Sequence, residues 1–131
     1  MDEKTLVLCC IQRCLSGSGD ACKSLLKLQL SELDAIRLRA VFLALIMLLS
    51  KGNRQIRYSF LAQQANSLYP VAKIPVIGAS LGKILGKILG DLSTISWCTR
   101  RFFISAVVVN QSGVPGKGFK PLVKTLLNVN C

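Results

Sequence analysis

Four cysteines gather near the start of the chain, and thiolates are side chains that bind zinc readily. They are Cys9, Cys10, Cys14 and Cys22. Structural zinc sites pair Cys-x-x-Cys units or add histidine ligands, whereas this chain contains no such unit and no histidine. We therefore expect buried free thiols in a reducing compartment, and no metal site.

The carboxylates of the chain are too few and too unevenly placed to indicate an acid–base active site. The chain has six acidic residues, and five of them lie in its first 50 residues. General acid–base chemistry needs a positioned base, and nucleotide hydrolysis needs a phosphate-binding Gly-x4-Gly-Lys-Ser/Thr loop, which is absent. The sequence therefore predicts a protein that is not an enzyme and that carries no cofactor.

Glycine and lysine recur in one segment with a spacing of four residues that suits contact with an anion. The glycines recur every fourth residue, at Gly78, Gly82, Gly86 and Gly90. In a helix they share one face and let another backbone approach closely, at a propensity cost of about 1 kcal/mol each. Lys83 and Lys87 form a basic edge beside this face, and Ser80 lies near the amino end. Two interpretations stay open: phosphate contacts, or close helix packing that includes self-association.

Positive charge is concentrated in the second part of the chain. The net charge is +11. Residues 1–50 carry six Lys/Arg and five acids, whereas residues 51–131 carry eleven Lys/Arg and the single acid Asp91. Such an imbalance favours binding of phosphates or anionic headgroups. A basic surface without a specific partner is the alternative.

These residues need elements to position them. Helix-like patterns cover residues 5–14 and 21–30, and a start signal at Ser31 and Asp34 precedes a broad apolar stripe that ends at residues 51–53. The stripe contains Ile36, Leu38, Val41, Phe42, Leu45, Ile46 and Leu49. This breadth predicts a central helix that is covered on several sides.

The second part of the chain predicts a mixture of helices and strands. We expect a short extended entry at residues 55–59, a helix from Phe60 to Leu68 capped by Ser59, and a helix from residue 78 to about 97. Residues 102–109 read as the strongest strand, since six of the eight are β-branched or aromatic. A turn-rich loop follows, and Pro121 suits the first turn of a last helix that ends near Leu127.

Three short motifs in this order resemble a known DNA-binding module. Residues 58–62 (YSFLA), 104–113 (ISAVVVNQSG) and 116–119 (GKGF) are similar to segments of the winged-helix domain of the alkylguanine-DNA alkyltransferase family and its alkyltransferase-like relatives. The resemblance implies a recognition helix from Ala79 onward and a wing at residues 111–117. It also implies that the protein cannot transfer alkyl groups, because Ser105 stands where the family has its acceptor cysteine and Ala106 where it has histidine.

Together these patterns predict an α+β fold that is mostly helical. We expect a helical unit (residues 1–52) packed on a winged-helix-like half (residues 53–131) with a short β-hairpin or small sheet, the whole forming one globule. The expected function is non-enzymatic binding of duplex DNA, with RNA as the less favoured ligand. The candidate nucleic-acid contacts are Arg54, Arg57, Tyr58, Lys73, Ser80, Lys83, Lys87, Arg100, Arg101, Lys117 and Lys120.

An alternative function is a small interaction or inhibitor module, of the kind that mobile elements encode, docking on an acidic protein or nucleoprotein complex. A homodimer through the glycine face is also open. We expect no membrane partner, because the longest apolar run, residues 40–49, is half of the roughly 20 residues that a spanning helix needs. The acidic start of the chain does not resemble a signal peptide, which predicts a cytoplasmic protein, nucleoid-associated if the host is bacterial.

Overall fold

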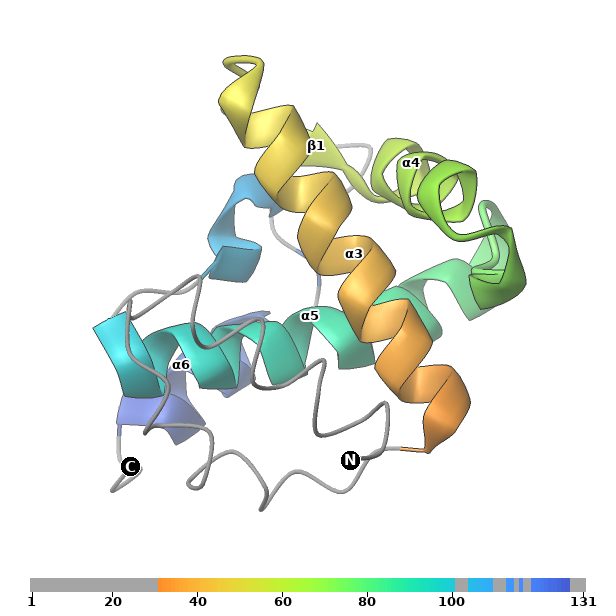
Figure 1. Ribbon diagram of the computed structural model, residues 1–131. Helices are drawn as coiled ribbons and strands as arrows, with labels where there is room; N and C mark the ends of the chain where they lie inside the picture. Colours follow the sequence, from red (N-terminus) through yellow and green to blue (C-terminus); the bar gives the residue numbers. More distant parts are fainter. Residues whose placement is uncertain (1–30, 101–103, 110–112, 115, 117–118, 128–131) are drawn as a thin grey trace.

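Three helices enclose the core of the protein. The computed structural model describes residues 31–100, 104–109, 113–114, 116 and 119–127. Helix α3 (Glu32–Ser50) crosses α5 (Gly78–Arg100), and α4 (Tyr58–Leu68) packs against both (Figure 1). A two-stranded sheet and α6 (Phe119–Leu127) complete the described part. The predicted fold class, mostly helical with a small sheet, is confirmed.

Helix α3 begins where the sequence predicts. Ser31 has an extended backbone, and its hydroxyl accepts a hydrogen bond from the backbone N–H of Asp34 at 3.1 Å. This bond satisfies one of the N–H groups that the first turn of a helix leaves without a partner. The cap therefore fixes the start of α3.

The carboxyl end of α3 is also fixed by local bonds. The backbone N–H of Gly52 donates to the carbonyl of Leu49 at 3.0 Å, and that of Asn53 donates to Leu48 at 3.2 Å. These two bonds are the pair that defines a Schellman motif. Gly52 has φ of +92°, which a residue with a side chain adopts only with strain. The predicted stop at residues 51–53 is confirmed.

Helix α3 is buried on a broad face, as expected, but not along the whole predicted stripe. Leu38, Val41, Phe42 and Leu45 are buried, and three alanines at 35, 40 and 44 bring the neighbouring helices close. Ile46 is 41% exposed instead. Leu48, two residues further along, is buried in the core. The face of α3 that α4 and α5 cover is therefore rotated from the predicted one.

Helix α4 starts earlier than predicted, at Tyr58 with Arg57 as its N-cap. The predicted cap at Ser59 is wrong, because that residue is already helical and Arg57 makes no side-chain cap bond. The preceding strand β1 (Ile56–Arg57) fixes the chain in an extended conformation up to residue 57, and the helix begins directly after it. Helix α4 ends at Leu68, before the short 3-10 helix η1 (Pro70–Ala72).

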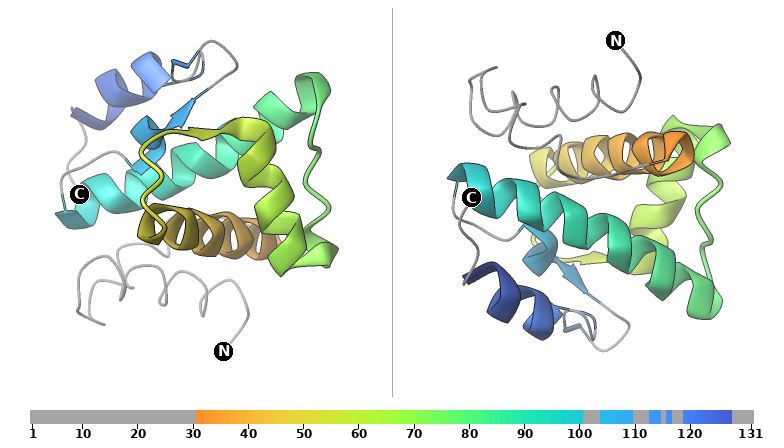
Figure 2. Two further views of the ribbon diagram at one scale, coloured as in Figure 1. Left: turned by 90° about the horizontal axis from the view of Figure 1, so that it is seen from above. Right: turned by 90° about the horizontal axis from the view of Figure 1, so that it is seen from below.

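Helix α5 lies at the centre of the described structure. In both views of Figure 2, α3 lies on one side of α5 and α6 on the other. Its apolar side chains are buried, among them Leu81, Leu85, Ile88, Leu89 and Leu92. The segment that carries the repeated glycines and lysines therefore gives its apolar face to the protein core.

The sheet differs from the prediction in length and direction. Strands β1 and β2 (Val108–Val109) pair in parallel, with Ile56 opposite Val108 and Arg57 opposite Val109. Parallel strands cannot form a hairpin, so of the two predicted possibilities the small sheet is present and the hairpin is wrong for these strands. Residues 104–107, expected in a strand, form the 3-10 helix η2 (Ile104–Val107). This segment has β-branched residues at both ends but no strand to pair with in the described structure, because the two residues of β1 pair only with Val108 and Val109.

Helix α6 confirms the predicted last helix. It contains Pro121 near its start and ends at Leu127. The helices expected at residues 5–14 and 21–30 lie outside the described residues, as do the first two residues of the strand expected at 102–109.

Candidate nucleic-acid interface

Three cations gather at the turn between α3 and β1. Lys51, Arg54 and Arg57 are all exposed, and we refer to them as the turn group. The Schellman motif fixes the turn at its start, and the pairing of Arg57 with Val109 in the sheet fixes its end. No acidic residue occurs in the sequence between Asp34 and Asp91. The turn group therefore presents positive charge from a defined backbone.

A second set of cations lies at the other end of α3. Arg37, near the start of α3, donates from Nε to the Ala72 carbonyl at 2.8 Å and from Nη2 to the Lys73 carbonyl at 3.2 Å. Lys73 therefore lies beside the amino end of α3, whereas the turn group follows its carboxyl end. Ser50 follows Arg37 by thirteen positions, which places these ends about 20 Å apart along the helix. The predicted contact Lys73 thus lies apart from the predicted contacts Arg54 and Arg57.

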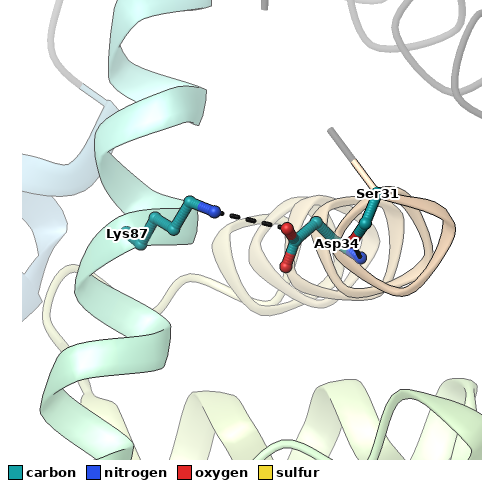
Figure 3. A network of polar contacts seen from close by, with 3 residues as sticks. All are labelled: Ser31, Asp34 and Lys87. Atoms are coloured by element: carbon teal, nitrogen blue, oxygen red, sulfur yellow. Dashed lines mark hydrogen bonds and ion pairs between the residues drawn. The ribbon is translucent and has the colours of Figure 1, made fainter. Parts of the chain in front are cut away.

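Lys87, a predicted phosphate contact, already has an acidic partner inside the protein. Its Nζ lies 3.2 Å from Oδ2 of Asp34, so the ion pair joins α5 to the first turn of α3 (Figure 3). Desolvation alone would raise the pKa of Asp34, but hydrogen bonds with Ser31 and Lys87 and the charges of Lys87 and Arg37 outweigh it, and the pKa is lowered. An external phosphate would have to compete with this carboxylate.

Asp91 follows Lys87 by one helical turn and is the one acid of residues 51–131. Burial raises the pKa of its carboxyl, the charge of Lys87 opposes that rise, and the charge of Asp34 adds to it. Two carboxylates therefore act on Lys87, which makes this part of α5 less cationic than the sequence alone suggests.

Tyr58 is not the exposed ring that stacking on a nucleotide base requires. It is half-buried against the core, and a backbone hydrogen bond joins its hydroxyl to Gly116. Desolvation raises the pKa of Tyr58, and the bond with Gly116 partly opposes that rise. The side chain holds the loop that follows β2 against the junction of β1 and α4. We therefore assign Tyr58 a structural role.

The glycine face of α5 is open within the described part of the chain. A Cβ built on Gly82, Gly86 or Gly90 meets no atom within 4 Å, and the same is true of Gly78. Close approach of another backbone at these glycines, one of the two interpretations of their spacing, is therefore wrong for contacts among the described residues. Lys83 and Ser80 are exposed on the same helix.

Of the other predicted contacts, the structure describes some and not others. Lys120 is exposed in the first turn of α6, and Arg100 is the last residue of α5. Arg101, Lys117 and most of the predicted wing at residues 111–117 lie outside the described residues. Lys51 is an exposed cation of the turn group that the sequence analysis did not name as a candidate; its position directly before the predicted stop at Gly52 was the available signal.

Two polar side chains that sequence reasoning did not single out fix the connection between α4 and α5. Asn66 donates from Nδ2 to the carbonyl of Ile74 and accepts from its N–H, both at 2.8 Å. Arg37 binds the adjacent carbonyls of Ala72 and Lys73. Asn66 lies 8 positions before Ile74, and Arg37 lies 35 positions before Ala72, so the local sequence does not predict these contacts. Only the tertiary structure reveals these two sets of hydrogen bonds, which we call the clamps.

Within the described ranges, no three His, Cys, Asp or Glu side chains come together as a metal site. Over the same ranges, no helix combines the length and apolar character needed to cross a bilayer. The cysteines at 9, 10, 14 and 22 lie outside those ranges. Comparisons of the chain with protein-family models, curated proteins and solved structures found no match, so its resemblance to the alkyltransferase family stays a prediction.

Proposed function

We propose that this protein is a non-enzymatic DNA-binding protein that contacts the phosphates of duplex DNA through the turn group. The observation that carries the proposal is the exposure of Lys51, Arg54 and Arg57 on a turn whose two ends are fixed, with no acid in the surrounding sequence. Cations held in place bind a phosphate backbone with a smaller loss of conformational freedom than cations on a loose loop.

Lys120, in the first turn of α6, is the further cation that we assign to this surface. Gly116 lies against Tyr58, which directly follows Arg57. Lys120 comes four residues after Gly116, so its Cα lies within about 14 Å of that contact. Lys120 is exposed. The turn group and Lys120 together offer four cations to one stretch of duplex, a number that suits sequence-independent binding.

Lys73, Ser80, Lys83 and Lys87 belong to a different part of the surface. Lys73 lies about 20 Å from the turn group along α3, and Lys87 is bound to Asp34. We therefore propose that these four residues do not contribute to the same duplex contact.

Salt titration of binding to a short random duplex tests the proposal. The slope of log K against log salt should fall in magnitude by about 0.9 for each phosphate contact removed, so Arg54→Ala and Lys51→Ala should each flatten it by that amount. Lys73→Gln is the matched control, since it removes an exposed lysine at the opposite end of α3 and should leave the slope unchanged. Equal slopes for all four proteins would refute the assignment.

The alternative function, an interaction module that docks on an acidic protein, is supported by the open glycine face of α5. A mobility shift with random duplex, beside a pull-down from nuclease-treated lysate, separates the two functions. DNA binding predicts the shift. The interaction module predicts capture of an acidic protein that survives nuclease treatment, without a shift.

A further inference from the structure

The connection between α4 and α5, residues 70–77, exposes the two most accessible large apolar side chains of the described structure. Ile77 is 79% exposed and Val71 is 62% exposed. Both Figure 1 and Figure 2 show this connection along an outer edge of the molecule, away from the sheet and α6. Exposed aliphatic groups that gather on one segment mark an interaction site more often than isolated ones do.

The exposure of Val71 and Ile77 does not come from a loosely held segment. Their neighbours Ala72 and Ile74 are 0% and 3% exposed and belong to the core. The clamps from Arg37 and Asn66 hold the backbone of residues 72–74 by four hydrogen bonds of 2.8 to 3.2 Å. The connection is therefore anchored through Ala72 and Ile74, and Val76 also packs partly against the core, while Val71, Lys73 and Ile77 are exposed.

The charge around the connection is positive. Lys73 lies between the two aliphatic residues and is exposed, with its backbone in the left-handed region at φ of +46°. Lys83, six residues after Ile77, is also exposed. Residues 51–90 contain no acid, and the carboxylate of Asp34, at this end of α3, is already paired with Lys87.

We infer that this connection docks on the surface of an anionic lipid bilayer, which departs from the expectation of no membrane partner because surface docking needs no spanning helix. Aliphatic side chains enter the boundary between headgroups and acyl chains, while adjacent ammonium groups meet the anionic headgroups. A phosphate backbone alone gives exposed Ile77 and Val71 no apolar surface to enter. Leu81, Leu85, Ile88, Leu89 and Leu92 of α5 are in the core, so the contact is shallow and weaker than that of a single myristoyl chain, about 10⁴ M⁻¹.

Sedimentation of the full chain with sucrose-loaded vesicles measures this contact. Vesicles of phosphatidylcholine with phosphatidylserine should bind the protein, and vesicles of phosphatidylcholine alone should bind it much less. The double variant Val71→Ser, Ile77→Ser should lower the partition coefficient about tenfold, since it removes both inserted aliphatic groups. Lys73→Gln should lower it about fivefold, the loss expected for one lysine at an anionic surface.

Leu127→Ser is the matched control, because Leu127 is 59% exposed but belongs to α6. It should bind the anionic vesicles as the unaltered protein does. Circular dichroism of each variant checks folding, which we expect to be unchanged because the replaced side chains are exposed.

Two results would overturn the inference. One is equal binding of the unaltered protein and the double variant to anionic vesicles. The other is a double variant that loses duplex DNA or captured protein instead of vesicles, which would assign the connection to that partner. The inference does not depend on DNA binding: Arg54→Ala tests the turn group, and its result leaves the comparison between the double variant and Leu127→Ser unaffected.

Discussion

The hydroxyl of Tyr58 occupies the space that a side chain at position 116 would need. A Cβ built on Gly116 overlaps the phenolic oxygen of Tyr58 and lies 3.1 Å from its Cζ. Tyr58 is partly buried and packs against the core, which limits movement of its ring. This contact joins the first residue of α4 to the loop before α6 and explains why glycine occupies position 116.

Replacing Gly116 by alanine should therefore destabilise the protein. We expect the free energy of unfolding to fall by about 1–3 kcal/mol, the range for overpacking. Tyr58→Phe removes the overlapping oxygen as well as its hydrogen bond, so the double variant should lose less than the sum of the single losses. Urea unfolding of the four proteins of this cycle measures the coupling. Strictly additive losses would contradict the contact.

The open glycines of α5 should respond in the opposite way. Gly82→Ala and Gly86→Ala introduce a Cβ that meets nothing within 4 Å. Each should raise the free energy of unfolding by up to about 1 kcal/mol, because alanine has the higher helix propensity. Gly78 has the same free space but φ of +81°, so Gly78→Ala should destabilise. Thermal denaturation of the three variants gives the signs; a loss of stability in Gly82→Ala would mean that another surface covers this face.

The ion pair between Asp34 and Lys87 should contribute modestly to stability. Both groups are partly exposed, and such pairs contribute about 0.2–1 kcal/mol. Asp34→Asn and Lys87→Gln, with the double variant, give the coupling free energy from urea midpoints. Because the pKa of Asp34 is lowered in the folded protein, its stabilisation is present at neutral pH and is lost as the pH falls through that lowered value. A coupling that does not weaken in acid would contradict the pair.

Asp91 should show the reverse dependence on pH. Its pKa is raised by burial, so the folded protein binds a proton more tightly than the unfolded chain does. The favourable contribution is therefore complete below the ordinary pKa of 3.8 and is lost as the pH rises through the folded value. Asp91→Asn should raise the melting temperature at pH 7 and change it little in acid. A lower melting temperature at pH 7 would show that pairing with Lys87 outweighs burial.

Local patterns decide much of the helical part of this fold. The Ser31 cap, the stop at Gly52 and the last helix ending at Leu127 each depend on interactions within a few residues of the chain, and all three were predicted. In α5 as well, the apolar residues Leu81, Leu85, Ile88 and Leu89 recur at helical spacing and belong to the core. The cationic stretch of residues 51–90, which contains no acid, is likewise a property of the sequence alone.

Only the tertiary structure decides how those elements and charges are used. Residues 104–107 have the composition of a strand but form η2, because a strand needs a partner and β1 supplies one for two residues only. The sequence shows that Lys87 is a cation, but only the structure shows that it forms an ion pair with Asp34, 53 positions away. The exposure of Ile77 and the free space at Gly82 are also decided by the tertiary structure. Whether a residue is buried depends on which distant segments pack against it, and the local sequence does not determine that.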